Sequence, residues 1–499
     1  MPESIDFQKL LELFQYDKFD PLLFGTSLFL FFFLAVLIIY RVFAQNNALK
    51  IYSLIFFSLF FYYKAANYFV ALLLLSSILN FYSGKFIFKT ASQNMKRLIL
   101  TTTIIINLGI LVYFKYTNFF LEIIMNISGG EFEPLKILLP IGISFYTFKA
   151  MSYIIEIYFE MIEPTDSFRD FTLFIFFFPN LLMGPIDRAS TFIPQIEREY
   201  KLTNHDVGLA LFLICSGLIK KYVIADYVSL NFTDRVFEFP LRFTGVENLL
   251  AIYGAAMVGY CDFSGYTDLA LAVGLLLGFK MIDNFNRPFK AYSIADYWRR
   301  WHISLSTWLL DYLFKPLQIS LRNMRGYGTS IAIFVTFFIV GLWHGPNWTF
   351  ILFGLLHSIY LIFSMATQKY RDAFYSKLGI KDSKVLRVFQ IFFTFNLLVF
   401  TAILFRTPSL EYFSHMLSQI FTYFHAEVLL QYVEAYPIII ILLGFAYLMH
   451  YTPLSWEKKT VELLSKIPVV VQALILAVVI WFVIQFKSAE LQPFIYFQF

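Results

Sequence analysis

The stretch IAIFVTFFIVGLWHGPNW, residues 331–348, joins a long apolar run to a single histidine, and a Gly-Pro pair follows that histidine directly. A second apolar run begins at Trp348, and lysine and arginine are frequent in the outer flanks of both runs. Because positively charged loops tend to remain on the cytoplasmic side of a membrane, both flanks are expected there. The pattern predicts a hairpin that enters the membrane from the cytosol and carries His344 at its turn.

The first arm of this hairpin, residues 331–342, is short. Its twelve residues rise roughly 18 Å into a hydrocarbon layer of about 30 Å, which places His344 within the membrane. An ionisable side chain at that depth is costly unless it lines a wet cavity or has a partner, and this favours a functional role for His344. The alternative is a histidine that packs between helices and bonds a neighbouring carbonyl group.

The composition is that of a polytopic membrane protein. Of 499 residues, 59% are hydrophobic and only 15% are charged, far from the average of soluble domains. Apolar runs recur along the whole chain, so we predict an all-α fold with about ten to twelve transmembrane helices plus re-entrant or interfacial helices. One membrane domain over residues 1–499 is the simplest organisation. The two cysteines provide no metal-binding spacing, and no basic patch indicates nucleic-acid binding.

Several segments depart from plain membrane-spanning helices. Residues 1–20 place Ile5, Leu10, Leu11 and Phe14 on one side of a helical wheel, which predicts an amphipathic surface helix or a packed start to the first span. The acidic start and the charged loops that follow it predict both chain termini outside the cytoplasm. The apolar runs at residues 119–127, 171–183 and 207–219 are too short to span, and the last two are expected to be re-entrant or broken helices.

A tryptophan-rich polar segment, YSIADYWRRWHISLSTW, covers residues 292–308. On one helix, Trp298, His302 and Ser306 would share a face, while Arg299 and Arg300 would turn toward headgroups. His302 is expected either to assist the chemistry, to orient a substrate, or to satisfy the backbone of a neighbouring broken helix.

Two further blocks lie inside apolar surroundings. In FPNLLMGPIDR, residues 178–188, Gly184 and Pro185 are expected to interrupt a helix and expose backbone groups to a channel. In YCDFSGYTD, residues 260–268, Asp262 and Asp268 indicate either a proton path or a hydrogen-bonded structural turn.

Four blocks have now been described: the His344 turn, the tryptophan-rich segment and the two blocks at residues 178–188 and 260–268. Together with PIGISF at residues 140–145, they resemble the membrane-bound O-acyltransferase family. The resemblance is strongest to its bacterial branch that acylates exported polysaccharides, the alginate O-acetylation type. The resemblance runs over residues 20–405, and residues 406–499 add further spans. It implies a ring of helices around a central tunnel, with His344 as the catalytic histidine of the family and His302 as a second catalytic histidine, the one in the tryptophan-rich motif. We place further residues along the expected substrate path: Trp343, Asn347, Trp348, Trp298, Trp301, Ser306, Asp296, Gly184 and Pro185.

The expected reaction is acyl transfer to a hydroxyl group, with neutral His344 as general base. No tightly bound cofactor or metal is expected. Acetyl-CoA is the simplest donor, with Lys315, Arg322 and Arg325 near its phosphates, and an acyl carrier protein thioester is the alternative. The resemblance also suggests a separate periplasmic, esterase-like partner, an exported polysaccharide as acceptor and a location in the bacterial inner membrane.

Other functions remain open at this point. The same chemistry could serve D-alanyl transfer, or a lipid or protein acceptor. In a different class, Asp262, Asp268, His302 and His344 could form the proton relay of a transporter. The sequence shows no inverted repeat, which weakens the transporter reading.

Overall fold

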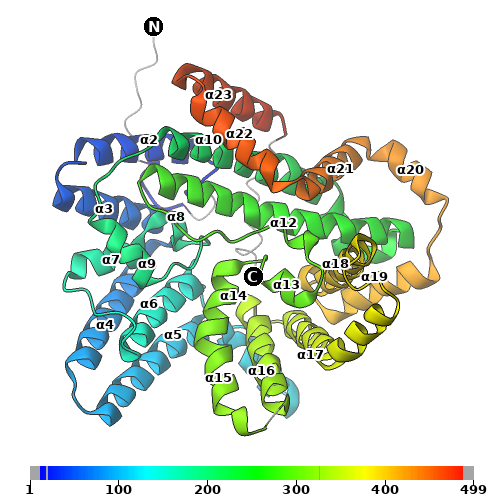
Figure 1. Ribbon diagram of the computed structural model, residues 1–499, viewed down its shortest axis with the longest axis horizontal. Helices are drawn as coiled ribbons and strands as arrows, with labels where there is room; N and C mark the ends of the chain where they lie inside the picture. The colour runs from blue at the N-terminus through cyan, green and yellow to red at the C-terminus, as the bar shows by residue number, and fades with distance from the viewer. Residues whose placement is uncertain (1–11, 18–20, 325, 487–499) are drawn as a thin grey trace. The chain divides into compact units, whose positions relative to one another are not determined.

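The computed structural model describes residues 12–17, 21–324 and 326–486 (Figure 1). Within these residues every regular element is a helix, and the one strand-type pairing is an isolated antiparallel bridge between Phe285 and Trp301. The predicted all-helical fold is confirmed. Residues 1–11, on which most of the predicted amphipathic N-terminal helix falls, lie outside the described residues.

The chain divides into two compact units. The first contains the described residues up to Asp206 together with Ala270–Met281, and the second contains Val207–Leu269 and the described residues from Ile282 onward. The helices of the first unit are α2 (Ser27–Val42), α3 (Asn47–Ala66), η1 (Asn67–Phe69), α4 (Val70–Lys89), α5 (Gln93–Ser128), α6 (Ile143–Tyr158), α7 (Phe168–Phe176), α8 (Phe178–Leu181) and α9 (Ala189–Ile196).

The second unit begins within α10 (Asn204–Leu218) and holds the remaining helices, except that the end of α12 belongs to the first unit. They are η2 (Ile219–Asp226), η3 (Ser229–Thr233), α11 (Asp234–Glu238), η4 (Pro240–Arg242), α12 (Gly245–Leu276), η5 (Pro288–Lys290), α13 (Ile294–Trp298), α14 (Ile303–Leu309), η6 (Leu310–Phe314), α15 (Lys315–Ser320), η7 (Arg322–Met324), α16 (Gly326–His344), α17 (Trp348–Lys377), α18 (Lys384–Arg406), α19 (Leu410–Thr422), α20 (Val428–Ala435), α21 (Pro437–Tyr451), α22 (Leu454–Lys466) and α23 (Val469–Phe486).

In the first unit, α4, α5 and α6 pack against one another (Figure 1). Polar side chains tie α4 to α5 inside this apolar bundle: Asn80 and Asn107 exchange amide hydrogen bonds of 3.1 and 2.9 Å, and Thr103 donates to Ser83. Such pairs satisfy polar groups that neither lipid nor packed side chains can solvate.

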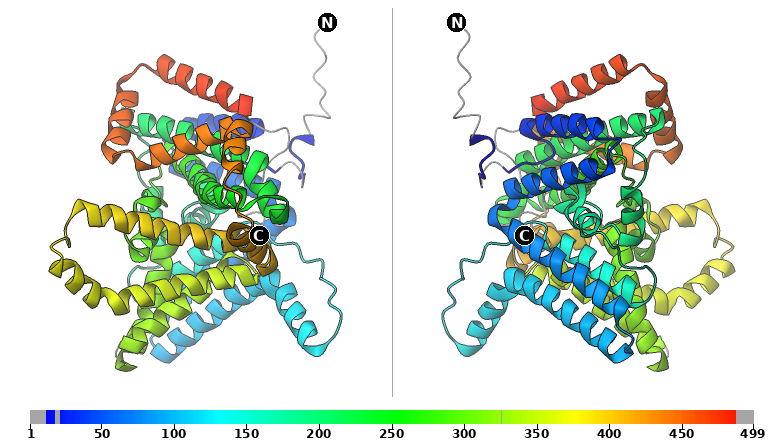
Figure 2. Two further views of the ribbon diagram at one scale, coloured as in Figure 1. Left: turned by 90° about the vertical axis from the view of Figure 1, so that its right-hand side faces the viewer. Right: turned by 90° about the vertical axis from the view of Figure 1, so that its left-hand side faces the viewer.

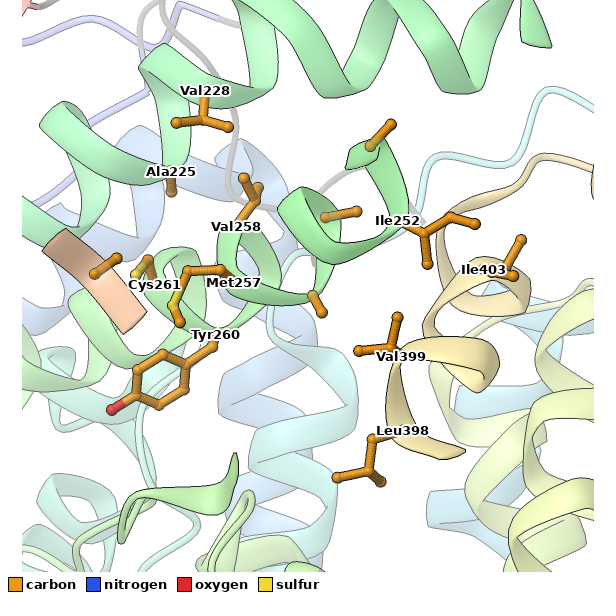
Figure 3. Close-up of a cluster of buried hydrophobic side chains, with 14 of the residues drawn as sticks. Ala225, Val228, Ile252, Met257, Val258, Tyr260, Cys261, Leu398, Val399 and Ile403 are labelled. Atoms are coloured by element: carbon orange, nitrogen blue, oxygen red, sulfur yellow. The ribbon is translucent and has the colours of Figure 1, made fainter. Parts of the chain in front are cut away.

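In the second unit, a buried apolar cluster joins η2, α12 and α18. Figure 3 shows Ala225, Met257, Val258 and Val399 among its members. The α17–α18 hairpin extends from this core, and Figure 2 shows the turn at residues 378–383 that joins its two helices.

Helices α16 and α17 pack closely because glycines lie where they approach each other. A Cβ atom on Gly354 would stand 2.2 Å from the carbonyl oxygen of Phe337, and one on Gly341 would stand 2.5 Å from that of Phe350. Only glycine lets two helical backbones approach this closely. The contact lies one helical turn before His344.

Seven stretches of the described chain are long and apolar enough to cross a membrane, or eight if α20 and α21, bent by 90°, form one span. The sequence predicted ten to twelve crossings. The count is lower because α3 and α4 join through η1 into one stretch of 43 residues, and because α2 and α6 have only 16 residues each. The polytopic helical character of the chain is confirmed.

Two predicted interruptions are absent from the described chain, and one predicted arm is longer than expected. Residues 119–127, predicted to be too short to span, are the end of the continuous 36-residue helix α5. Residues 207–219 were expected to end at a charged break, but the helical stretch continues from Asn204 to Glu238. Helix α16 has 19 residues instead of the predicted twelve, a rise of about 28 Å, which is long enough to cross a hydrocarbon layer of about 30 Å.

Candidate functional site

His344 is the last residue of α16, and its side chain is only 4% exposed. Aromatic rings surround the imidazole, with centroids of Phe405 at 4.9 Å, Trp343 at 5.0 Å and Phe353 at 5.7 Å. These rings come from α16, α17 and α18. Both imidazole nitrogens are shielded from solvent, so a substrate must displace neighbouring side chains to reach them.

Trp343 brings the two predicted catalytic histidines together. Its ring centroid lies 5.0 Å from that of His344 and 5.6 Å from that of His302, so the two imidazoles are separated by no more than the sum of these distances. Their sequence positions are 42 residues apart: His302 lies in the turn before α14, and His344 is the last residue of α16. The structure therefore brings His302 and His344 close to one Trp343 ring in the second unit, and their catalytic roles stay a prediction.

His302 adopts an unusual backbone conformation, with φ at 43° and ψ at 54°. A non-glycine residue in this left-handed region costs about 1–3 kcal/mol and persists only where the surroundings enforce it. The surroundings here are Asn284 and its neighbours: the Ile303 amide donates to the Asn284 carbonyl, and the bridge between Phe285 and Trp301 continues the pairing.

The ring of His302 is held in a defined state. Its Nδ1 lies 3.3 Å from Oδ1 of Asn284, and that oxygen also accepts from the backbone amide and the hydroxyl of Ser304. The Ser304 amide can only donate, which identifies its partner as the side-chain oxygen of Asn284, and an amide oxygen can only accept. Nδ1 of His302 therefore carries the proton, and Nε2 has the lone pair. Burial lowers the pKa of His302 to about 3, so the imidazole is neutral at physiological pH.

The tryptophan-rich segment is not one helix. Helix α13 ends at Trp298, the chain turns through Arg299–His302, and α14 starts at Ile303. The prediction that Trp298, His302 and Ser306 share one helical face is therefore wrong. Pairing with residues 284–286 pulls the backbone out of the helix at His302, a long-range constraint that helical periodicity does not contain.

Three predicted site residues in this segment make local bonds. Asp296 pairs with Arg300 at 3.0 Å and accepts from the Tyr292 amide, Ser306 donates to the Trp301 carbonyl, and Trp301 stacks on Tyr297 at 5.6 Å. These contacts hold the turn that carries His302. A direct contact with a substrate stays a prediction for each of them.

The turn after His344 is fixed by Asn347. Its Oδ1 caps α17 by accepting from the Thr349 amide at 3.0 Å, and its Nδ2 donates to the Pro408 carbonyl at 2.7 Å. Trp348 begins α17 and is 54% exposed. Asn347 thus has a structural role, and a place on the substrate path stays a prediction for both Asn347 and Trp348.

Two of the three predicted donor-binding cations, Lys315 and Arg322, lie in or directly after α15. Lys315 is half exposed and pairs with Asp311 one turn earlier at 2.8 Å, and Arg322 begins η7. Arg325 lies outside the described residues. The Lys315–Asp311 pair lowers the net positive charge that Lys315 can offer to a phosphate.

Gly184 and Pro185 belong to the first unit, in a block that is buried throughout. A Cβ on Gly184 would stand 2.2 Å from Cα of Asn180. Asn180 bridges the fully buried Lys149, whose ammonium donates to its Oδ1 at 2.8 Å, and Asp187, which accepts from its Nδ2 at 2.8 Å. The predicted helix break is confirmed. It lets the backbone at Gly184 lie against Asn180, the residue that bonds both Lys149 and Asp187.

Asp262 and Asp268 lie on the continuous helix α12, so the turn considered for them is absent. Lys221 donates to Asp262 at 2.6 Å and also pairs with Asp226, while Lys220 and Ser216 both donate to Asp268. Both carboxylates are thus neutralised by cations from η2. Among the described residues, no group of acidic, histidine and cysteine side chains could hold a metal ion.

Comparison with known proteins supports the resemblance. A model of the membrane-bound O-acyltransferase family matches residues 162–406, a range that contains both histidines. A peptidoglycan O-acetyltransferase of Helicobacter pylori is 33% identical over 425 residues, 78% of this chain and 78% of that protein. The chain belongs to the membrane-bound O-acyltransferase family.

Two other relatives are less completely covered. A probable alginate O-acetylase of Azotobacter vinelandii is 38% identical over 65% of this chain and 63% of its own length. A teichoic acid D-alanyltransferase of Bacillus subtilis is 30% identical over 48% of this chain and 63% of its own length. The chain spans slightly less than two thirds of these two proteins. As a member of the family, the protein is a multi-pass membrane O-acyltransferase.

Sequence reasoning missed several residues of this membrane-bound O-acyltransferase. His357 on α17 is completely buried between the tryptophan-rich segment and α18, and Asn284 holds His302. Lys220 and Lys221 neutralise the α12 carboxylates. A buried histidine and adjacent lysines inside an apolar run were visible signals, since each needs a partner in that environment.

Proposed function

We propose that this protein transfers an acetyl group from a cytosolic thioester to hydroxyl groups of an exported polysaccharide. His344 is the general base: its neutral imidazole takes the hydroxyl proton while the oxygen attacks the thioester carbonyl carbon. The carbon–sulfur bond then breaks, and the leaving thiolate receives the proton from the imidazolium. The assembly of His344 and His302 around Trp343 carries the proposal.

His302 supports this chemistry as a neutral group beside the reacting atoms. The bond from its Nδ1 to Asn284 leaves Nε2 as an acceptor, which suits a side chain that orients an acceptor hydroxyl. The aromatic box around His344 lowers the local dielectric constant, and this strengthens electrostatic stabilisation of a developing oxyanion. Trp348, Asn347 and backbone amides of the turn are the proposed donors to that oxyanion.

The acetyl group and the polysaccharide are proposed from the named relatives. Two of them are named as O-acetyl transferring enzymes, for peptidoglycan and alginate, and a third as a D-alanyltransferase for teichoic acid. The peptidoglycan O-acetyltransferase matches a larger share of this chain than the D-alanyltransferase does, and this favours acetyl over D-alanyl transfer. Acetyl-CoA is the proposed donor, with an acyl carrier protein thioester as the alternative.

We further propose a location in the bacterial inner membrane, with both termini outside the cytoplasm and a separate periplasmic, esterase-like partner that completes delivery. The positive flanks of the α16–α17 hairpin support this orientation. The ion pairs of Asp262 and Asp268 with lysines count against a transporter with a carboxylate relay.

The test uses purified protein in proteoliposomes with radiolabelled acetyl-CoA and a panel of polysaccharide, lipid and protein acceptors. The wild type should transfer label to a polysaccharide, and His344→Ala should lose at least about 10³-fold in rate, in the range of a lost general base. His415→Ala, on the partly exposed face of α19, is the control and should keep the wild-type rate. A well-folded His344→Ala protein with normal transfer would overturn the proposal, and label on lipid or protein alone would overturn the acceptor class.

A further inference from the structure

A hydrogen-bond chain connects three helices of the second unit through His357. The Trp298 indole Nε1 on α13 donates to His357 Nδ1 on α17 at 3.2 Å. His357 Nε2 lies 3.2 Å from the Thr401 hydroxyl on α18, and that hydroxyl donates to the Leu398 carbonyl at 2.9 Å. Both His357 and Thr401 are buried.

The direction of every bond in this chain is determined. An indole N–H can only donate, so Nδ1 of His357 must accept. The proton of the Thr401 hydroxyl is directed to Leu398, so Nε2 of His357 donates to Thr401. His357 is therefore a neutral imidazole in one tautomer, because a second proton on Nδ1 would face the indole N–H.

These hydrogen bonds join the two segments that carry the proposed catalytic histidines. Trp298 lies four residues before His302, at the end of the short helix α13. His357 lies on α17, which begins directly after the His344 turn. Between them, Phe353 lies 4.6 Å from the His357 ring and 5.7 Å from the His344 ring.

We infer that His357 is a positioning residue that fixes the Trp298–His302 segment against the α16–α17 hairpin and so sets the separation of His302 and His344. The inference rests on the proposed roles of those two histidines. His357 itself does not reach the reacting atoms, because Trp298 and Thr401 occupy its ring nitrogens. It acts by removing the freedom of α13, which is only five residues long and cannot hold its own position.

Graded variants separate positioning from packing. His357→Phe keeps a ring but removes both bonds, and Trp298→Phe removes only the indole donor. His357→Asn places an amide oxygen near the Nδ1 position and can still accept from Trp298. We expect about a tenfold loss of kcat with little change of KM in the two phenylalanine variants, and substantial recovery in His357→Asn.

The two phenylalanine substitutions should also be non-additive. If Trp298 and His357 act through one bond, the double variant should be no slower than His357→Phe alone. A packing role predicts that activity follows thermal stability instead, with His357→Phe close to wild type. Thr401→Val, which keeps the shape of the side chain and removes the acceptor, gives a second route if His357→Phe does not fold.

The measurement is the rate of label transfer from radiolabelled acetyl-CoA in proteoliposomes, with thermal melting of each variant and His415→Ala as control. If acetyl-CoA gives no transfer with the wild type, the variants are ranked by the ester-linked acyl content of the envelopes of cells that produce them. An active His344→Ala variant would refute the proposed function. An inactive His344→Ala together with wild-type kcat in the folded Trp298→Phe and Thr401→Val variants would refute the positioning role alone.

Discussion

Replacing Gly354 by alanine should slow acyl transfer by disturbing the helix contact next to His344. The new Cβ would stand 2.2 Å from the Phe337 carbonyl oxygen and 3.0 Å from the Gly341 nitrogen, where ordinary contact begins at 3.4 Å. Helices α16 and α17 must therefore separate by about 1 Å, since both close atoms are backbone. His344 follows Gly341 by one turn and must move with α16.

The size of the effect follows from the tolerance of catalytic geometry. Productive arrangements are held within about 0.5 Å, and a misplacement of about 1 Å can cost 10²-fold in rate. Overpacking of this kind destabilises a protein by about 1–3 kcal/mol, which leaves the fold intact. We expect Gly354→Ala to lose about 10²-fold in kcat while it still reaches the membrane.

The assay compares transfer rate and melting temperature in proteoliposomes for Gly354→Ala and Gly444→Ala. Gly444 is the matched control, because no atom lies within 4 Å of its added Cβ and alanine favours the helix by up to about 1 kcal/mol. Gly444→Ala should keep the wild-type rate. A folded Gly354→Ala protein with an unchanged rate would refute the claim that this contact positions His344.

Four further results are expected. His302→Asn should fold better than His302→Ala in thermal melts, because asparagine tolerates the left-handed backbone, and both should lose activity. Burial lowers the pKa of His302 to about 3, so its contribution to the free energy of unfolding is complete above about pH 6.5 and falls as the pH is lowered. Melting of the wild type between pH 6.5 and pH 4 should show a loss of about 1.4 kcal/mol of unfolding free energy per pH unit, and His302→Asn should lack this loss. Lys221→Met should cost about 3–5 kcal/mol, seen as loss of monodisperse protein, since it removes the cation that pairs with the buried Asp262 and the partly buried Asp226. Lys315→Met at an exposed pair should cost under about 1 kcal/mol. Asn347→Ala should lower the melting temperature through loss of about 1 kcal/mol of helix capping, and an unchanged melting curve would contradict its structural role.

The sequence predicted those features that depend on local composition and apolar run length. Helices α18 and α23 are of this kind, because each is a long, mainly apolar run between charged or proline-containing ends. The His344 turn was recognisable from its Gly-Pro pair between two apolar runs. Each of these signals lies within a few tens of consecutive residues, so it can be recognised without knowing the fold.

Long-range pairing accounts for the predictions that failed. The helix from Asn204 passes Lys220 and Lys221 without a break because carboxylates of α12 neutralise them, and no local pattern records that partner. The backbone of His302 leaves its helix because Asn284, 18 residues earlier, pairs with the segment. His357 was missed for the same reason, since its role depends on Trp298 and Thr401 from other helices.

The most direct test of the central claim is the transfer rate of His344→Ala, His302→Asn and the double variant, measured side by side. If the two histidines work as one site around Trp343, the double variant should be no more than a few-fold slower than His344→Ala alone, because residues that act as a unit are strongly non-additive. Losses that multiply, or a folded His344→Ala protein with the normal rate, would contradict the account.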